Sequence, residues 1–224
     1  MMKEIARIFV PRILIAVALS VLISVACSVA LGETPGEAPG SDVFTTPREA
    51  LLREKPSLQT KIVAKLPQGS RLTLIEARGA FLRVEAPGQP PVWIARDVVV
   101  IFPPDARAAR DLVMIGRSFG RNDTNRRLAA ALLQRASERL RGAKTPDPEV
   151  EVLLGETVEG LAASGPPFSK ELGVVERQGV SGPRGVYDGS AFGRALEILA
   201  TDKGNEHCAL RERALAGALR ARYP

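Results

Sequence analysis

The residues that most often do chemistry in proteins are few in this chain and poorly placed for it. His207 is the one histidine in 224 residues, so a zinc site built from several histidines is excluded. Cys208 follows it directly. Neighbours on a helix point about 100° apart, whereas a cysteine–histidine pair needs converging side chains and a third group that orients the base. We therefore expect a non-enzyme with no catalytic residues, no metal ligands and no cofactor.

Carboxylates are abundant in one segment, where a pair of acids could act as general acid and base. We interpret them as the solvated face of a helix, because of their spacing. A pair of the kind that cleaves glycosidic bonds stays open as an alternative, since no motif marks or excludes one. The carboxylates are those of Glu149, Glu151, Glu156 and Glu159.

A second group of side chains is suited to binding. Trp93, the single tryptophan, and Phe81 lie in the same stretch as Arg53, Arg83 and Arg96. Exposed aromatic rings offer wide contact at little entropic cost, so one interpretation makes Trp93 and Phe81 the floor of a ligand groove rimmed by the arginines. The other places Trp93 in the core of a small domain, where large aromatics contribute greatly, and leaves the arginines solvated.

Short strands between residues 42 and 102 must position these side chains. Leu72 and Leu74 alternate with polar residues, in the period of two that a half-buried strand requires. The apolar runs are followed by turn residues, which lie at 67–70, 78–79 and 87–91. Short strands with closely spaced turn signals predict a small β-barrel.

Several motifs in this stretch resemble the bacterial SH3 (SH3b) family. The matches are Leu52-Arg53 with Pro56-Ser57 for the family's opening VR-x-x-PS, Leu66 with Gly69 for its L-x-x-G turn, residues 79–84 for NGWYKV, and Val92-Trp93-Ile94 for GWV. Phe81 and Leu82 stand where larger aromatics are common, and Val92 replaces a glycine. The resemblance implies an SH3-like barrel over residues 42–102, a location outside the cytoplasm, and a cell-wall or peptide ligand.

Helical periodicity takes over beyond Pro103-Pro104, and residues 105–224 predict a helical domain. Asp105 and Thr124 are predicted to cap the first two helices, and Gly116 to break the first one. Helix pairs joined by a few residues indicate αα-hairpins and weakly resemble tetratricopeptide-type repeats. Cys208 shares a helical face with Leu215, which predicts a buried, inert thiol. The predicted helices are 105–115, about 124–142, about 148–163, 190–199 and 205–222.

Residues 1–31 predict export. The run from Ile13 to Leu31 carries no charge and follows Lys3, Arg7 and Arg12, the pattern of a membrane-inserting segment with cytoplasmic cations. A cleaved signal peptide and a retained membrane anchor both fit, because small residues accumulate at its end while its length approaches the roughly 20 residues of a spanning helix.

A third outcome of this leader is lipidation of Cys27. Val25-Ala26-Cys27 resembles the end of a lipobox, with Ser24 where that motif usually has leucine. Residues 32–41 are rich in proline and glycine and predict a flexible linker between the leader and the barrel.

We therefore expect a multi-domain β + α chain: a leader or anchor helix, an SH3-like barrel, and a helical domain. The predicted function is that of an exported, non-catalytic binding protein of the bacterial cell envelope, which recognises a cell-wall component or peptide. A scaffold whose helices dock an envelope protein is the alternative, and an accessory enzyme acting on peptidoglycan is the second. The net charge of +6 lies partly in the leader, and we expect no nucleic-acid partner.

Overall fold

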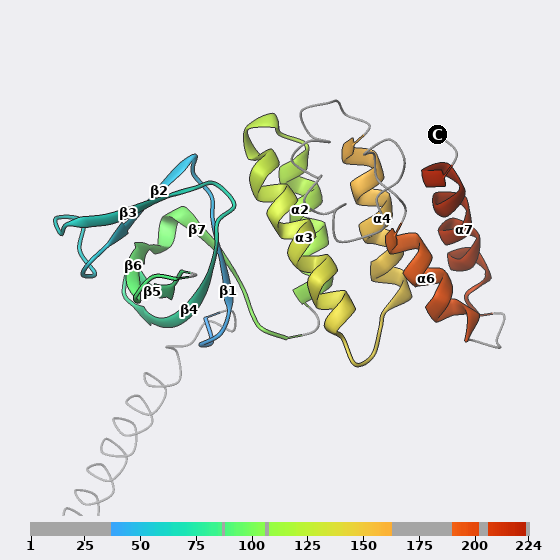
Figure 1. Ribbon diagram of the computed structural model, residues 1–224, viewed down its shortest axis with the longest axis horizontal. Helices are drawn as coiled ribbons and strands as arrows, with labels where there is room; N and C mark the ends of the chain where they lie inside the picture. The colour runs from blue at the N-terminus through green and yellow to red at the C-terminus, as the bar shows by residue number, and fades with distance from the viewer. Residues whose placement is uncertain (1–36, 87, 106–107, 163–189, 202–205, 223–224) are drawn as a thin grey trace, which may run out of the picture.

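The computed structural model describes residues 37–86, 88–105, 108–162, 190–201 and 206–222. In these ranges an antiparallel seven-stranded sheet is followed by five α-helices, so the expected order of β and then α is confirmed (Figure 1). The strands are β1 Asp42–Thr45, β2 Glu49–Arg53, β3 Ile62–Pro67, β4 Arg71–Arg78, β5 Phe81–Glu85, β6 Val92–Ala95 and β7 Val99–Phe102. A short 3-10 helix, η1 Arg96–Val98, connects β6 to β7.

The strands lie in the order β3-β2-β6-β5-β4-β1-β7, with β3 and β7 at the two ends. Alternate residues of the central strands point to one side, where they form an apolar core. This core lacks large aromatics and rests on small and branched side chains, as the composition implies. Its buried members are Val43, Ala50, Leu52, Leu72, Leu74, Leu82, Val84, Ala86, Val92 and Ile94.

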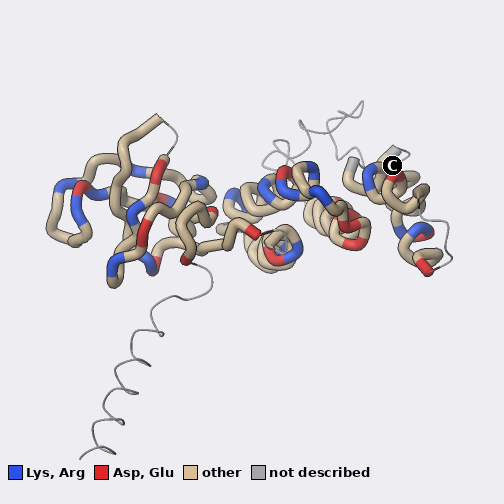
Figure 2. The backbone as a smooth tube through the Cα atoms, turned by 90° about the horizontal axis from the view of Figure 1, so that it is seen from below, with Lys and Arg blue, Asp and Glu red and all other residues tan. Residues whose placement is uncertain are grey.

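Helices of the second part follow one another in a row from the sheet to the C-terminal end (Figure 1). Acidic and basic residues are spread over both parts, as Figure 2 shows. Leu128, Leu132 and Ala136 lie on one buried face of α3, at the spacing that the sequence predicts. The helices are α2 Ala108–Gly120, α3 Arg126–Gly142, α4 Pro148–Ala162, α6 Ser190–Ala200 and α7 Cys208–Arg222, with the 3-10 turn η2 Asp123–Asn125 before α3.

Two of the predicted helix ends are wrong. Gly116 lies inside α2, because the helix packs closely on α3: a Cβ at this position would lie 3.2 Å from Leu133 side-chain atoms. Thr124 does not cap α3, because it lies inside η2, and the residue before α3 is Asn125, whose side chain makes no capping hydrogen bond. Asn122 caps η2 instead, and its Oδ1 accepts a hydrogen bond from the Thr124 backbone N–H. The predicted cap of α2 is confirmed, since Asp105 Oδ1 accepts from the Ala108 N–H at 3.0 Å.

Aromatic rings connect the sheet to the helices. Phe44 of β1 and Phe102 of β7 are 1% and 3% exposed and belong to the core of the helices, not to that of the sheet. Their rings pack edge to face, with centroids 6.0 Å apart. Gly69 also lies against the helices, since a Cβ there would come within 2.8 Å of the Arg127 carbonyl oxygen. The sheet therefore depends on α2 and α3 to cover two of its largest apolar side chains.

The predicted linker contacts the sheet before residue 42. The Gly40 N–H donates to the Leu74 carbonyl at 2.7 Å, and the Leu74 N–H donates to the Ser41 carbonyl at 2.9 Å. The predicted leader, residues 1–31, and the candidate lipidation site Cys27 lie outside the described residues. Within the ranges that the structure covers, none of the helices has the length and apolar character that crossing a bilayer requires.

Candidate functional site

Three of the predicted site residues form one row across three neighbouring strands. Trp93 in β6 lies opposite Arg53 in β2 on one side and opposite Arg83 in β5 on the other. Residues directly opposite in antiparallel strands point to the same face, with Cβ atoms about 4.5–5.5 Å apart. Trp93 is therefore flanked on both sides by an arginine.

This row lies on the outer face of the sheet. The sequence neighbours of Trp93, Val92 and Ile94, both belong to the core of the sheet, and Trp93 does not. Trp93 is nevertheless only 9% exposed. Long arginine stems cover apolar surface while the charged head stays in water, so we attribute this burial to the half-buried Arg53 and Arg83. The sequence left two positions open for Trp93, in the core of the domain or on the floor of a ligand groove. The structure places it outside the core but covered by side chains.

The heads of the two flanking arginines are held differently. Arg53 Nη1 donates to the Thr60 carbonyl at 2.9 Å, which connects β2 to the loop before β3. Arg83 Nη1 lies 3.9 Å from Glu76 Oε1, and both side chains are exposed by more than two fifths. Exposed pairs of this kind contribute little to stability. Of the two flanking arginines, Arg83 is therefore the one that loses less free energy when it gives up its present contact to bind a ligand.

Phe81 and Arg96 lie beside this row and not in it. Phe81 lies opposite Ala95 and two residues before Arg83, so it shares the outer face and is half-buried. Arg96 begins η1, where its guanidinium pairs with Glu37 at 2.6 Å. Its Nε is buried and makes no hydrogen bond within the described part of the chain. We call Trp93, Phe81, Arg53 and Arg83 the tryptophan face.

Exposed apolar side chains next to this face were missed by the sequence analysis. Leu58, in the loop between β2 and β3, is 68% exposed, and Ile62 and Val63 of β3 are 41% and 44% exposed. Ile62 lies opposite Arg53 and so continues the row beyond Trp93. The alternation of apolar and polar residues fails at Ile62 and Val63, where two apolar residues follow a polar loop. This failure could have indicated an edge strand with exposed apolar side chains.

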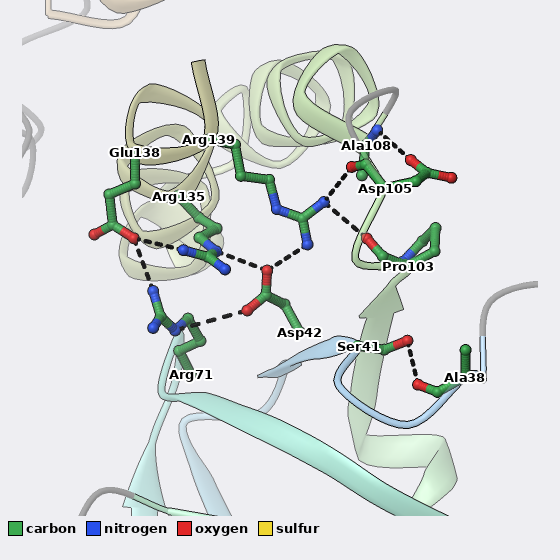
Figure 3. Close-up of polar contacts among 10 residues, drawn as sticks. All are labelled: Ala38, Ser41, Asp42, Arg71, Pro103, Asp105, Ala108, Arg135, Glu138 and Arg139. Atoms are coloured by element: carbon green, nitrogen blue, oxygen red, sulfur yellow. Dashed lines mark hydrogen bonds and ion pairs between the residues drawn. The ribbon is translucent and has the colours of Figure 1, made fainter. Parts of the chain in front are cut away.

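A cluster of charged side chains lies where the sheet meets α3 (Figure 3). Asp42 is 5% exposed at its side chain and faces Arg135, Arg139 and Arg71, whose nearest nitrogens lie at 2.7, 2.5 and 3.7 Å. Glu138 completes the cluster with contacts to Arg135 and Arg71. Burial lowers the pKa of the Arg135 guanidinium, but the hydrogen bonds and charges of Asp42 and Glu138 outweigh burial and raise this pKa above its ordinary value. The cluster is fully paired, which makes it structural.

The carboxylates of α4 pair with arginines of other helices. Glu151 is not solvated as predicted: it is 2% exposed and forms two hydrogen bonds of 2.8 Å with Arg194 of α6. Glu156 and Glu159 bind Arg213 and Arg220 of α7 in the same two-pronged geometry, and Glu149 pairs with Arg110 of α2. Salt bridges of this kind hold the helices together, and they occupy all four of these carboxylates.

Cys208 is also placed differently from the prediction. It shares a helical face with Leu215 as expected, but that face is exposed, so the thiol is accessible and not buried. In the described ranges no group of three or more histidine, cysteine or acidic side chains could hold a metal ion.

A cavity of about 680 Å³ lies between α2, α3 and the start of α4. Its walls are largely apolar. Arg139 binds Asp42 and the carbonyls of Pro103 and Asp105, and Arg110 pairs with Glu149. Asp147 caps α4 through the N–H groups of Glu149 and Val150. The exposed Asp111 also lines this cavity, and the other three charged residues of its wall are occupied by protein groups.

Comparisons with known proteins give no further identification. No family model matches the chain, and no curated protein matches it either.

Proposed function

We propose that this chain is an exported, non-catalytic binding protein of the bacterial cell envelope, whose SH3-like barrel recognises a cell-wall or peptide ligand. The row Arg53–Trp93–Arg83 on the outer face of the sheet supports this proposal, because it places a cation on each side of an aromatic ring that lies outside the core. Carboxylates of peptide stems and of acidic peptides are the ligand groups that such a row would attract.

The remaining parts have supporting roles in this proposal. The helices, as tetratricopeptide-like hairpins, cover Phe44 and Phe102 and hold the sheet in place. The leader carries the rest of the chain across the membrane, where it folds, and the leader is cleaved, retained or lipidated at Cys27. Cell fractionation tests the location: we expect the native protein in the envelope fractions, and cytoplasmic protein with an intact leader would contradict export.

Co-sedimentation of the full chain with purified peptidoglycan sacculi tests the binding role. We expect retention that is lost in Trp93→Ala and kept in Trp93→Phe, because phenylalanine preserves a ring on the face. The double charge reversal Arg53→Glu/Arg83→Glu should weaken retention by about tenfold, if each charge contributes on the order of 0.7 kcal/mol. A matched control, Arg117→Glu/Arg121→Glu, changes two exposed arginines at the end of α2, away from the face, by the same net charge. Thermal unfolding of each variant separates loss of binding from loss of folding.

An envelope scaffold is the second candidate, supported by the last helix. Leu215 and Leu219 lie one turn apart on α7, and each is 51% exposed. In this case Leu215→Lys/Leu219→Lys would abolish capture of an envelope protein, while sacculus binding by the wild-type chain would be absent. A zymogram with cell-wall substrate addresses the enzyme alternative, since a clearing band that survives His207→Ala would require a site elsewhere in the chain.

A further inference from the structure

The strand β3 forms an open end of the sheet. It pairs with β2 alone and lies last in the strand order. None of its six residues is buried. The tip of the hairpin that it forms with β2 points away from the helices, as Figure 1 shows, and the other end of β3 leads into the turn of Gln68 and Gly69, which contacts η2 and α3. At the other end of the sheet, Val100 and Phe102 of β7 pack against the helical core. The edge of β3 is therefore free of helices.

Backbone groups of β3 remain available along this edge. The Glu54 N–H donates to the Lys61 carbonyl, and the Gln68 N–H donates to the Arg48 carbonyl, which identifies the residues that bond toward β2. Bonding alternates along an antiparallel ladder, so Ile62 and Lys65 direct their N–H and C=O groups away from β2. The bulge at Val63 separates the two. Such a row of unpaired groups accepts a further strand.

Side chains around this edge select the kind of strand that can add. Lys61 and Lys65 flank the exposed Ile62 and Val63, and only Lys65 is paired, with the exposed Glu49 at 2.8 Å. Basic residues (blue) dominate over acidic ones at this end of the sheet in Figure 2. Ile62 and Lys65 lie opposite Arg53 and Leu51 and so share one face of the sheet. An incoming segment whose acids flank a central apolar pair would place its acids opposite the lysines and its apolar side chains opposite Ile62 and Val63.

A second copy of this chain is a poor occupant. An antiparallel β3–β3 pair centred on Val63 places Lys61 of each copy opposite Lys65 of the other. Like charges directly opposite destabilise a strand pair, and lysines on edge strands prevent self-association. The charge of this edge therefore favours a different chain with the opposite charge.

We infer that the free edge of β3 binds an extended acidic peptide by strand addition, with apolar side chains against Ile62 and Val63. This inference goes beyond the proposed function, because it concerns a strand edge and not the tryptophan face. Either can fail without the other: sacculus retention reports on the face, and protection of the β3 amides by the peptide reports on the edge.

The test uses the full chain and a fluorescent synthetic peptide in which glutamates flank a central pair of valines. We expect saturable binding by anisotropy at low salt, and slower amide hydrogen exchange in residues 61–66 when the peptide is present. Lys61→Glu/Lys65→Glu should raise Kd by about tenfold or more, since two charge pairs are reversed. Arg78→Glu/Arg117→Glu, with the same change in net charge, should leave Kd within about twofold. A peptide N-methylated at alternate positions should bind at least tenfold more weakly, because it lacks the N–H donors of a strand.

Four results would overturn the inference. They are no binding of the acidic peptide, equal binding of a matched lysine–valine peptide, binding without protection of the β3 amides, and a concentration-dependent dimer in which those amides are protected. Unfolding of the charge-reversed variant does not obscure the result, because N-methylation changes only the peptide.

Discussion

Asp42 Oδ2 accepts a hydrogen bond from Arg135 Nε at 2.7 Å, so the first residue of β1 is bonded to the middle of α3. Both the carboxylate and the neighbouring Arg139 are buried at the junction, with side chains 5% and 9% exposed. Removing one partner of a buried cluster leaves the other charges uncompensated. This relationship makes the junction between sheet and helices sensitive to a single substitution.

Asp42→Ala should lower the free energy of unfolding by about 3 kcal/mol, the usual cost of breaking a buried pair. Urea denaturation of the full chain measures this loss. Glu49→Ala is the matched control, because it breaks an ion pair with Lys65 whose side chains are more than half exposed. The control should cost about 1 kcal/mol or less, and equal losses in the two variants would contradict the structural role of Asp42.

Residues 42–102 expressed alone should bind a hydrophobic dye more strongly than the full chain does, and should unfold at a lower temperature. Phe44 and Phe102 lie in the core of the helices, so separating the sheet exposes both rings. Phe44→Ser/Phe102→Ser in the isolated segment should reduce dye binding. An isolated segment with the thermal stability of the full chain and no dye binding would show that the helices are dispensable for the sheet.

Gly217→Ala should destabilise the protein although alanine favours helices. A Cβ at Gly217 in α7 would overlap three ring carbons of Phe192, which is fully buried in α6. The helix gains about 1 kcal/mol from alanine, but overpacking costs about 1–3 kcal/mol, and we expect a net loss. Gly160→Ala in α4 is the control, because nothing lies within 4 Å of its added methyl group. The denaturation midpoint should fall in Gly217→Ala and rise in Gly160→Ala. If both midpoints moved in the same direction, the Phe192 ring would not lie against Gly217.

Gly69→Ala should cost more than Gly79→Ala, although both glycines have positive φ angles, of 79° and 59°. Alanine in the left-handed region costs about 1–2 kcal/mol at either position. At Gly69 the methyl group also meets the Arg127 carbonyl oxygen at 2.8 Å, whereas Gly79 faces open space. The difference in the free energy of unfolding between the two variants measures the contact between sheet and α3, and no difference would contradict it.

The strands could be predicted well because their signals are local. Turn residues and the alternation of Leu72 and Leu74 identify β4, and the same logic places β3, β5, β6 and β7 within a few residues. Asp105 likewise caps α2 as predicted, since capping depends on the nearest backbone N–H groups.

Other features depend on contacts between distant segments and carry no local signal. Gly116 continues α2 because Leu133, on another helix, needs the space. Glu151 is buried because Arg194 reaches it from α6. Trp93 required the registers of three strands before its arginine neighbours on β2 and β5 could be identified. The residues of the candidate face were therefore predicted from the sequence, but their arrangement on the sheet could not be predicted.

The position of Asp42 has a mechanical consequence for any tension that enters the folded part from its N-terminal side. Such a force reaches β1 first, and β1 pairs with both β4 and β7 while its leading carboxylate is held by α3. Pulling would have to rupture two ladders and a buried ionic contact together, instead of peeling a peripheral strand. The folded part therefore resists mechanical unfolding at its N-terminal end, where a tether would apply force.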